Sequence, residues 1–143
     1  MANLSSELVE QLRTAANTAA GHAYAPYSGF RVGATLLFDD GAVVTGCNVE
    51  NVSYSLTICA ERTALVRAVA ENGAQRKIVA VMVTNLNEAA SSVCGACLQM
   101  LSEFTTPSTV VYFAAGTGML SKRFEELLPF GFTNWKKEDD ARG

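Results

Sequence analysis

Hydrophobic residues recur along the chain with two spacings, one typical of helices and one typical of strands. After Ser5 and Ser6, which are suitable helix caps, apolar residues follow a helical period: Leu8, Leu12, Ala15, Ala16, Ala19 and Ala23. This pattern predicts a first helix of about five turns. The helix is expected to end before Pro26, because proline lacks an amide hydrogen and restricts the residue that precedes it.

Short apolar runs predict the strands. Residues 30–38 and 42–47 flank Asp39-Asp40-Gly41, and an Asp-Gly pair tolerates the positive φ angles of tight turns. These two runs therefore predict a β-hairpin. Residues 78–83 are rich in β-branched side chains and predict a buried strand, and residues 109–113 predict another.

Three further helices are predicted between and after these strands. One begins near Cys59 and ends at Gly73, a natural C-terminal stop. Another spans residues 94–104, and a short one spans residues 124–128 before Pro129. Strands that alternate with helices indicate an α/β layered domain, and the hairpin makes its sheet mixed.

Composition and charge narrow the class of substrate. The 143 residues are 49% hydrophobic and 17% charged, which is typical of one globular domain. Lys and Arg total 11 against 14 acidic residues, giving a net charge of -3. Because proteins that bind a nucleic-acid backbone usually carry a basic face, this balance favours a small-molecule substrate.

The N-terminus and the cysteines bear on location. No positively charged start followed by an apolar run is present, and no stretch reaches the ~18 apolar residues of a membrane helix. We therefore expect a cytoplasmic protein with no membrane partner. Thiols stay reduced there, so the four cysteines need a reason other than disulfides.

Three cysteines have the spacing of a metal site. Cys94 and Cys97 stand at the start of a predicted helix, where residues three apart share a face and exposed amides favour thiolates. Cys59 opens another predicted helix. Three protein ligands leave the fourth tetrahedral position of a zinc ion for water, and Glu61 is placed to approach that water. Arg62 is positioned to offset the negative charge of the thiolates.

Other interpretations of these residues remain open at this point. Cys94 and Cys97 fit a redox pair, although the usual context is a C-x-x-C after an early strand. With Cys47, all four cysteines could form a structural zinc site, but Cys47 is better explained as a buried strand residue. His22, the single histidine, is expected to be a packed or surface side chain.

The segments 59–62 and 93–97 resemble the H-x-E…P-C-x-x-C signature of the cytidine deaminase family, in which Cys can replace the His. Three more segments match the family in order: 24–33, 46–51 and 127–129. The resemblance runs from about Leu8 to Phe132, which is nearly the whole chain.

This resemblance implies a fold and an activity. The fold would be a three-layer α-β-α sandwich around a mixed, roughly five-stranded sheet, in one domain over residues 1–143 with a polar tail from about residue 133. The activity would be zinc-dependent hydrolytic deamination of cytidine and deoxycytidine in pyrimidine salvage. One Zn²⁺ per chain would be held by Cys59, Cys94 and Cys97, and Glu61 would move the protons.

The resemblance also implies where the nucleoside binds. Asn48 and Glu50 match the pair that binds the 3′-hydroxyl of the ribose, a task suited to an amide and a carboxylate. Phe30 matches an aromatic residue that lines the base pocket. Ala60 matches a residue whose backbone contacts the cytosine ring.

Two aromatic residues also match the family, whereas two other positions differ from its usual sequence. Tyr54 and Phe132 match residues that small family members contribute to a neighbouring subunit's site, which implies a homotetramer with shared sites. The family commonly has Pro where this chain has Val93, and Arg where it has Leu98. These departures leave open a modified cytosine nucleoside, such as blasticidin S, as the substrate. A zinc-stabilised interaction protein without turnover and a deaminase of single-stranded nucleic acid are the remaining alternatives.

Overall fold

A computed structural model of the chain describes residues 4–116 and 118–133. Five strands form one sheet in the order β2-β1-β3-β4-β5. Only β3 and β4 run parallel, and the other neighbours are antiparallel, which confirms a mixed five-stranded sheet. The strands are β1 (Val32–Phe38), β2 (Val43–Cys47), β3 (Ile78–Asn85), β4 (Thr105–Ala115) and β5 (Gly118–Arg123).

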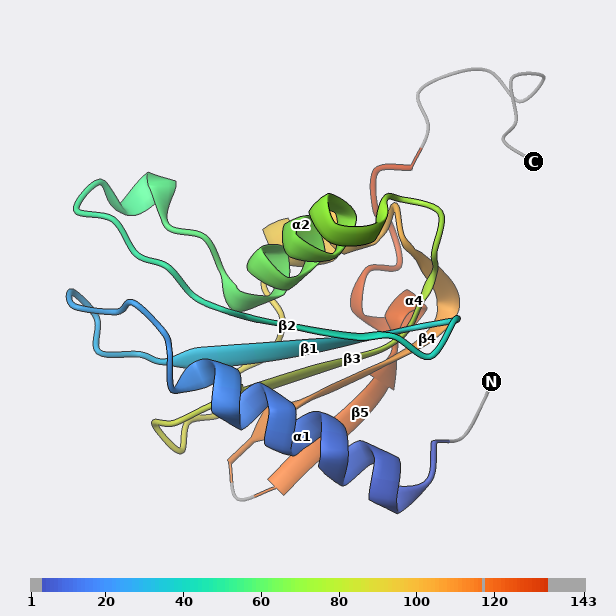
Figure 1. Ribbon diagram of the computed structural model, residues 1–143, viewed down its shortest axis with the longest axis horizontal. Helices are drawn as coiled ribbons and strands as arrows, with labels where there is room; N and C mark the ends of the chain where they lie inside the picture. Colours follow the sequence, from blue (N-terminus) through green and yellow to red (C-terminus); the bar gives the residue numbers. More distant parts are fainter. Residues whose placement is uncertain (1–3, 117, 134–143) are drawn as a thin grey trace.

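Helices cover both faces of this sheet. Figure 1 shows α1 on one face and α2 on the other, which confirms the three-layer arrangement. The helices are α1 (Ser6–Ala20), α2 (Ala60–Asn72), α3 (Gly95–Leu101) and α4 (Phe124–Leu127), with a 3₁₀ turn η1 (Tyr54–Leu56). Within the described residues, no helix combines the length and apolar composition needed to cross a membrane.

The strands divide the core between the two faces. Ala80 and Met82 of β3 pack with Leu12 and Ala16 of α1, whereas the intervening β3 side chains pack in the larger cluster with α2 and α3. All seven residues of β1 are buried, because helices cover it on both sides. A strand that is buried on both faces is expected to be apolar throughout, and the apolar run at residues 30–38 predicted β1 for this reason.

Two glycines let helices approach the sheet closely. A Cβ on Gly33 would lie 1.8 Å from the Ala16 carbonyl oxygen of α1, and one on Gly46 would lie 2.4 Å from the Ala64 nitrogen of α2. Both neighbours are main-chain atoms, so no side-chain movement could make room. Gly46 therefore sets how deeply α2 sits on β2.

Two predicted helices are longer than the observed ones. The first ends at Ala20, after about four turns, because Gly21 and His22 close it with backward hydrogen bonds and Tyr24 then bridges to Val49. The third, α3, ends at Leu101 and not near Phe104. The start of α1 is as predicted, since the Ser5 side chain accepts a hydrogen bond from the Leu8 amide at 3.1 Å.

Candidate metal centre and nucleoside pocket

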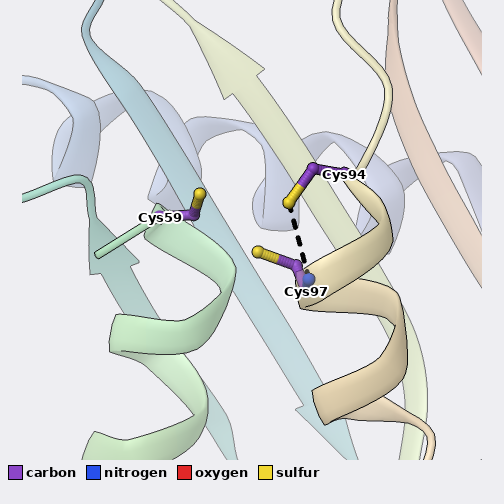
Figure 2. A group of neighbouring side chains, drawn as sticks. All are labelled: Cys59, Cys94 and Cys97. Carbon is purple, nitrogen blue, oxygen red and sulfur yellow. Dashed lines mark hydrogen bonds between the residues drawn. The ribbon is translucent and has the colours of Figure 1, made fainter. Parts of the chain in front are cut away.

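The three cysteines of the predicted metal site lie together at the starts of α2 and α3 (Figure 2). Cys59 is the N-cap of α2, Cys94 is the N-cap of α3, and Cys97 lies in the first turn of α3. Their Sγ atoms all lie within 4.8 Å of one another. Sulfurs on a tetrahedral zinc ion are about 3.8 Å apart, given Zn–S bonds of about 2.3 Å. The donor set and its spacing therefore fit zinc.

Hydrogen bonds inside this group shift the pKa values of two of its thiols in opposite directions. The pKa of Cys59 is lowered, chiefly because the Cys97 thiol donates to its sulfur and also because Arg62 lies beside it. The pKa of Cys97 is raised for the same reason, since its proton is held between the two sulfurs. A metal ion bound by both sulfurs would release that proton.

Arg62 contacts the sulfur group from α2. Its Nη2 donates to Cys59 Sγ at 3.5 Å and to the Thr57 carbonyl oxygen at 3.4 Å. The pKa of Arg62 is raised, chiefly by the hydrogen bond to Cys59. Three thiolates and one Zn²⁺ carry a net charge of about -1, so a guanidinium here reduces the negative charge of the site.

Glu61 is buried next to this group, with only 4% of its surface exposed. Burial raises the pKa of Glu61 to about 7, and the neighbouring Cys59 adds to the increase. A carboxyl group with such a pKa takes up and releases a proton near neutral pH. Glu61 therefore has the properties of a general acid and base.

A cavity of about 280 Å³ opens onto Glu61 and two of the cysteines. It brings together seven residues predicted from the sequence with several hydroxyl and apolar side chains. Its lining consists of Ser28, Phe30, Val32, Asn48, Glu50, Thr57, Cys59, Ala60, Glu61, Val83, Ser91, Ser92 and Cys94. The volume is close to that of small-molecule sites in proteins.

The buried side chain of Asn48 makes hydrogen bonds to two main-chain groups of the pocket wall. Its Oδ1 accepts from the Val32 amide at 2.9 Å, and its Nδ2 donates to the Phe30 carbonyl oxygen at 2.7 Å. The side chain thus holds residues 30–32, where β1 begins, in place. One amide hydrogen and one oxygen lone pair remain for a ligand.

Glu50 is fixed by the turn at residues 27–28. Its Oε1 accepts from the Tyr27 amide at 3.1 Å and from the Ser28 amide at 3.2 Å, and its Oε2 accepts from the Ser28 hydroxyl. These bonds, led by that of the Ser28 hydroxyl, lower the pKa of Glu50. The carboxylate is therefore ionised and oriented, and Oε2 keeps a lone pair for another donor.

Tyr54 and Phe132 do not line this pocket in the part of the chain that the structure describes. Both are exposed, at 70% and 66% of their surface. The Tyr54 ring meets the Tyr27 ring edge-on at 5.9 Å, and the main chain of Phe132 is bonded to the Gln99 side chain. Their side chains are available to a neighbouring molecule.

Other residues singled out from the sequence lie away from the chemistry. Among the described residues, Cys47 is not part of the possible metal-ligand group, and His22 is exposed. Val93 and Leu98 are both buried in the core cluster and do not line the pocket. Neither departure from the family pattern therefore presents a new side chain to a ligand.

Sequence reasoning missed several of the pocket's hydroxyl groups. Ser28 stood inside a segment that matched the family, but its contact with Glu50 spans 22 residues and has no local signal. Ser91 and Ser92 precede Cys94 in a loop of ordinary composition. Thr57 lies in the polar segment before α2 and likewise has no local signal of ligand binding.

The family model described as "Cytidine and deoxycytidylate deaminase zinc-binding region" matches residues 6–114. The chain belongs to this family. Its zinc-binding character agrees with the three-cysteine group, and zinc is the cofactor that this deaminase domain is built to hold.

Relatives of this deaminase chain cover most of its length. The chain is 51% identical over 121 residues to the cytidine deaminase of Mycobacterium tuberculosis, covering 85% of this chain and 86% of the relative. It is 46% identical over 112 residues to that of Halalkalibacterium halodurans, covering 78% and 83%. A crystal structure of the cytidine deaminase from Burkholderia pseudomallei superimposes with a TM-score of 0.80 at 39% identity, covering 90% of this chain and all of that chain (100%).

Proposed function

We propose that this chain catalyses the hydrolytic deamination of cytidine and deoxycytidine to uridine and deoxyuridine, with release of ammonia. One observation carries the proposal: a single cavity joins Glu61 and the cysteine group to the polar pair Asn48 and Glu50. Such a substrate has two parts. Its base carries the amino group that Glu61 and the metal site would remove, and its sugar carries hydroxyl groups that Asn48 and Glu50 would bind.

Glu61 is the proposed proton carrier. Zinc, when bound by the three cysteines, would lower the pKa of a coordinated water to about 7. Glu61 takes a proton from the attacking water and delivers it to N3 of cytosine, which makes C4 electrophilic. The hydroxide left by that transfer bonds to C4. Glu61 then takes the proton of the new C4 hydroxyl group and delivers it to the amino nitrogen, so that the C4–N bond breaks, a C4 carbonyl forms and ammonia leaves. The burial of Glu61, which favours the protonated carboxyl group, suits a side chain that must both accept and release a proton.

The sugar is proposed to bind to Asn48 and Glu50. A hydroxyl group needs one acceptor and one donor, and the free lone pair of Glu50 and the free amide hydrogen of Asn48 supply them. Phe30 and the main chain of Ala60 are proposed to contact the base. Since neither polar residue must be reoriented, binding costs little conformational entropy.

The proposed assembly is a homotetramer with shared sites. Tyr54 and Phe132 each expose a large ring that is absent from the pocket of their own chain, as expected of side chains that complete the site of another subunit. We further propose that residues 1–143 form one domain that acts in the cytoplasm, in pyrimidine salvage.

The decisive experiment measures turnover directly. The purified protein is incubated separately with cytidine, deoxycytidine and blasticidin S, and loss of the amino group is followed by ultraviolet absorbance. Turnover of the first two is expected. If protein with one zinc per chain converts none of the three, the proposal fails, whereas conversion of blasticidin S alone would favour a modified nucleoside as the substrate.

A further inference from the structure

The side-chain amide of Gln99 pairs with both main-chain polar groups of Phe132. Gln99 Nε2 donates to the Phe132 carbonyl oxygen at 2.6 Å, and the Phe132 amide donates to Gln99 Oε1 at 2.9 Å. In this way the side-chain amide satisfies both main-chain groups of one residue, as the main chain of a neighbouring strand does in a β-sheet. The Phe132 main chain is thereby fixed relative to α3.

The turn before Phe132 is closed as well. A Cβ on Gly131 would lie 2.6 Å from Leu128 Cδ2, and Leu128 packs against the main core cluster. The same position lies 3.7 Å from Gln99 Oε1. Residues 128–132 therefore form a turn that is anchored at both ends, by Leu128 in the core and by Gln99 on α3.

Two aromatic rings project from this anchored turn. Phe130 is 97% exposed and Phe132 is 66% exposed. Exposed apolar rings on an ordered main chain are typical of a surface that another molecule covers. Fixing the main chain in advance reduces the entropy that is lost when the rings become buried.

The anchor is on the helix that also holds two cysteines. Gln99 lies two residues after Cys97 on α3, and it is half-buried. We infer that Gln99 is a positioning residue, which holds the Phe132 ring in place for the nucleoside site of a second copy of this chain. This inference rests on the shared-site homotetramer proposed above.

The test replaces Gln99 with methionine, which has a similar length and helix propensity but can make neither hydrogen bond. Hydrogen–deuterium exchange is measured on zinc-loaded protein in peptides that contain Phe132, together with KM and kcat for cytidine. We expect faster exchange at Phe132 and a KM raised about 10-fold, because two hydrogen bonds that order the ring are lost. Zinc content and kcat should be unchanged. Gln11→Met, at an exposed position of α1, is the matched control.

A double-mutant comparison separates positioning from other roles of Gln99. In a Phe132→Ala background, Gln99→Met should raise KM no further, because the ring that it would misplace is absent. Gln99→Glu is a second variant in case the methionine variant folds poorly. It keeps an acceptor for the Phe132 amide but faces the Phe132 carbonyl with a second acceptor, so it should show an intermediate rate of exchange.

Unchanged exchange at Phe132 in Gln99→Met would overturn the inference, as would faster exchange with an unchanged KM. An equal rise of KM in the Phe132→Ala background would also overturn it. A wild-type protein that converts no nucleoside would refute the proposed function instead. That failure is distinguishable, because the exchange at Phe132 is measured without substrate.

Discussion

The position of α2 on the sheet depends on the absence of a side chain at Gly46, so the substitution Gly46→Ala tests how the site is built. The added Cβ would lie 2.4 Å from the Ala64 nitrogen and 2.6 Å from the Ala60 carbonyl oxygen. Ordinary contacts begin near 3.4 Å, so α2 must move by about 1 Å. Such overpacking typically costs about 1–3 kcal/mol of the free energy of unfolding.

The displacement of α2 should also lower the rate of the proposed reaction. Ala60 stands between Cys59 and Glu61, so a shift of its main chain moves a proposed zinc ligand and the proposed proton carrier together. A misplacement of about 1 Å can lower a catalysed rate about 100-fold. We therefore expect Gly46→Ala to lower both the midpoint of urea unfolding and kcat/KM for cytidine.

The matched control is Gly118→Ala, because a Cβ there would meet no heavy atom within 4 Å. It should leave kcat/KM unchanged and alter the unfolding free energy by less than about 1 kcal/mol. If Gly46→Ala had the wild-type unfolding midpoint and the wild-type kcat/KM, the argument that Gly46 sets the depth of α2 would be refuted.

Three other changes test individual groups. Glu61→Gln should keep zinc but lower kcat by about 10²- to 10⁴-fold, measured beside Glu71→Gln on the same helix, and near-normal turnover would exclude the proton-carrying role. Cys94→Ala should lose zinc, measured by elemental analysis, and melt at a lower temperature than wild type; a zinc-loaded variant would contradict the ligand assignment. Ser28→Ala should raise the pKa of Glu50 towards its ordinary value, because the Ser28 hydroxyl is the main cause of its lowering. An NMR titration of the Glu50 carboxyl carbon should therefore show this carboxyl group losing its proton at a higher pH in the variant than in the wild type. Because the pKa of Glu50 is lowered in the folded chain, the stability that its carboxylate adds is present above the ordinary glutamate pKa and is lost as pH falls through the lowered value.

Much of the fold could be predicted because periodicity and burial agree over most elements. Strand β1 was recognised from its continuous apolar run, and the ends of α2 from Cys59 and Gly73. Strand β5 was not recognised along the chain, because five of its six residues are exposed and it lies at the sheet edge beside β4. Its conformation depends on pairing with a distant segment, which local spacing does not encode.

The same division holds for the site. Cys94 and Cys97 are neighbours on one helix, so their spacing alone indicated a shared metal. Other contacts join segments that are far apart in sequence. Asn48 makes hydrogen bonds to residues 30–32, and Gln99 makes hydrogen bonds to Phe132. Such contacts follow from the tertiary arrangement, and only the structure reveals them.

The meeting of the α2 and α3 starts has a consequence for the unfolded chain. Cys59 and Cys94 are roughly 35 residues apart, and the segment between them contains α2 and β3. A metal held by both cysteines closes this segment into a loop, as a covalent cross-link would. Because the unfolded chain offers no preformed site, the binding free energy of the ion adds to the stability of the folded chain. The ion would thus hold the starts of α2 and α3 together, and its removal would lower the stability of the fold as well as turnover.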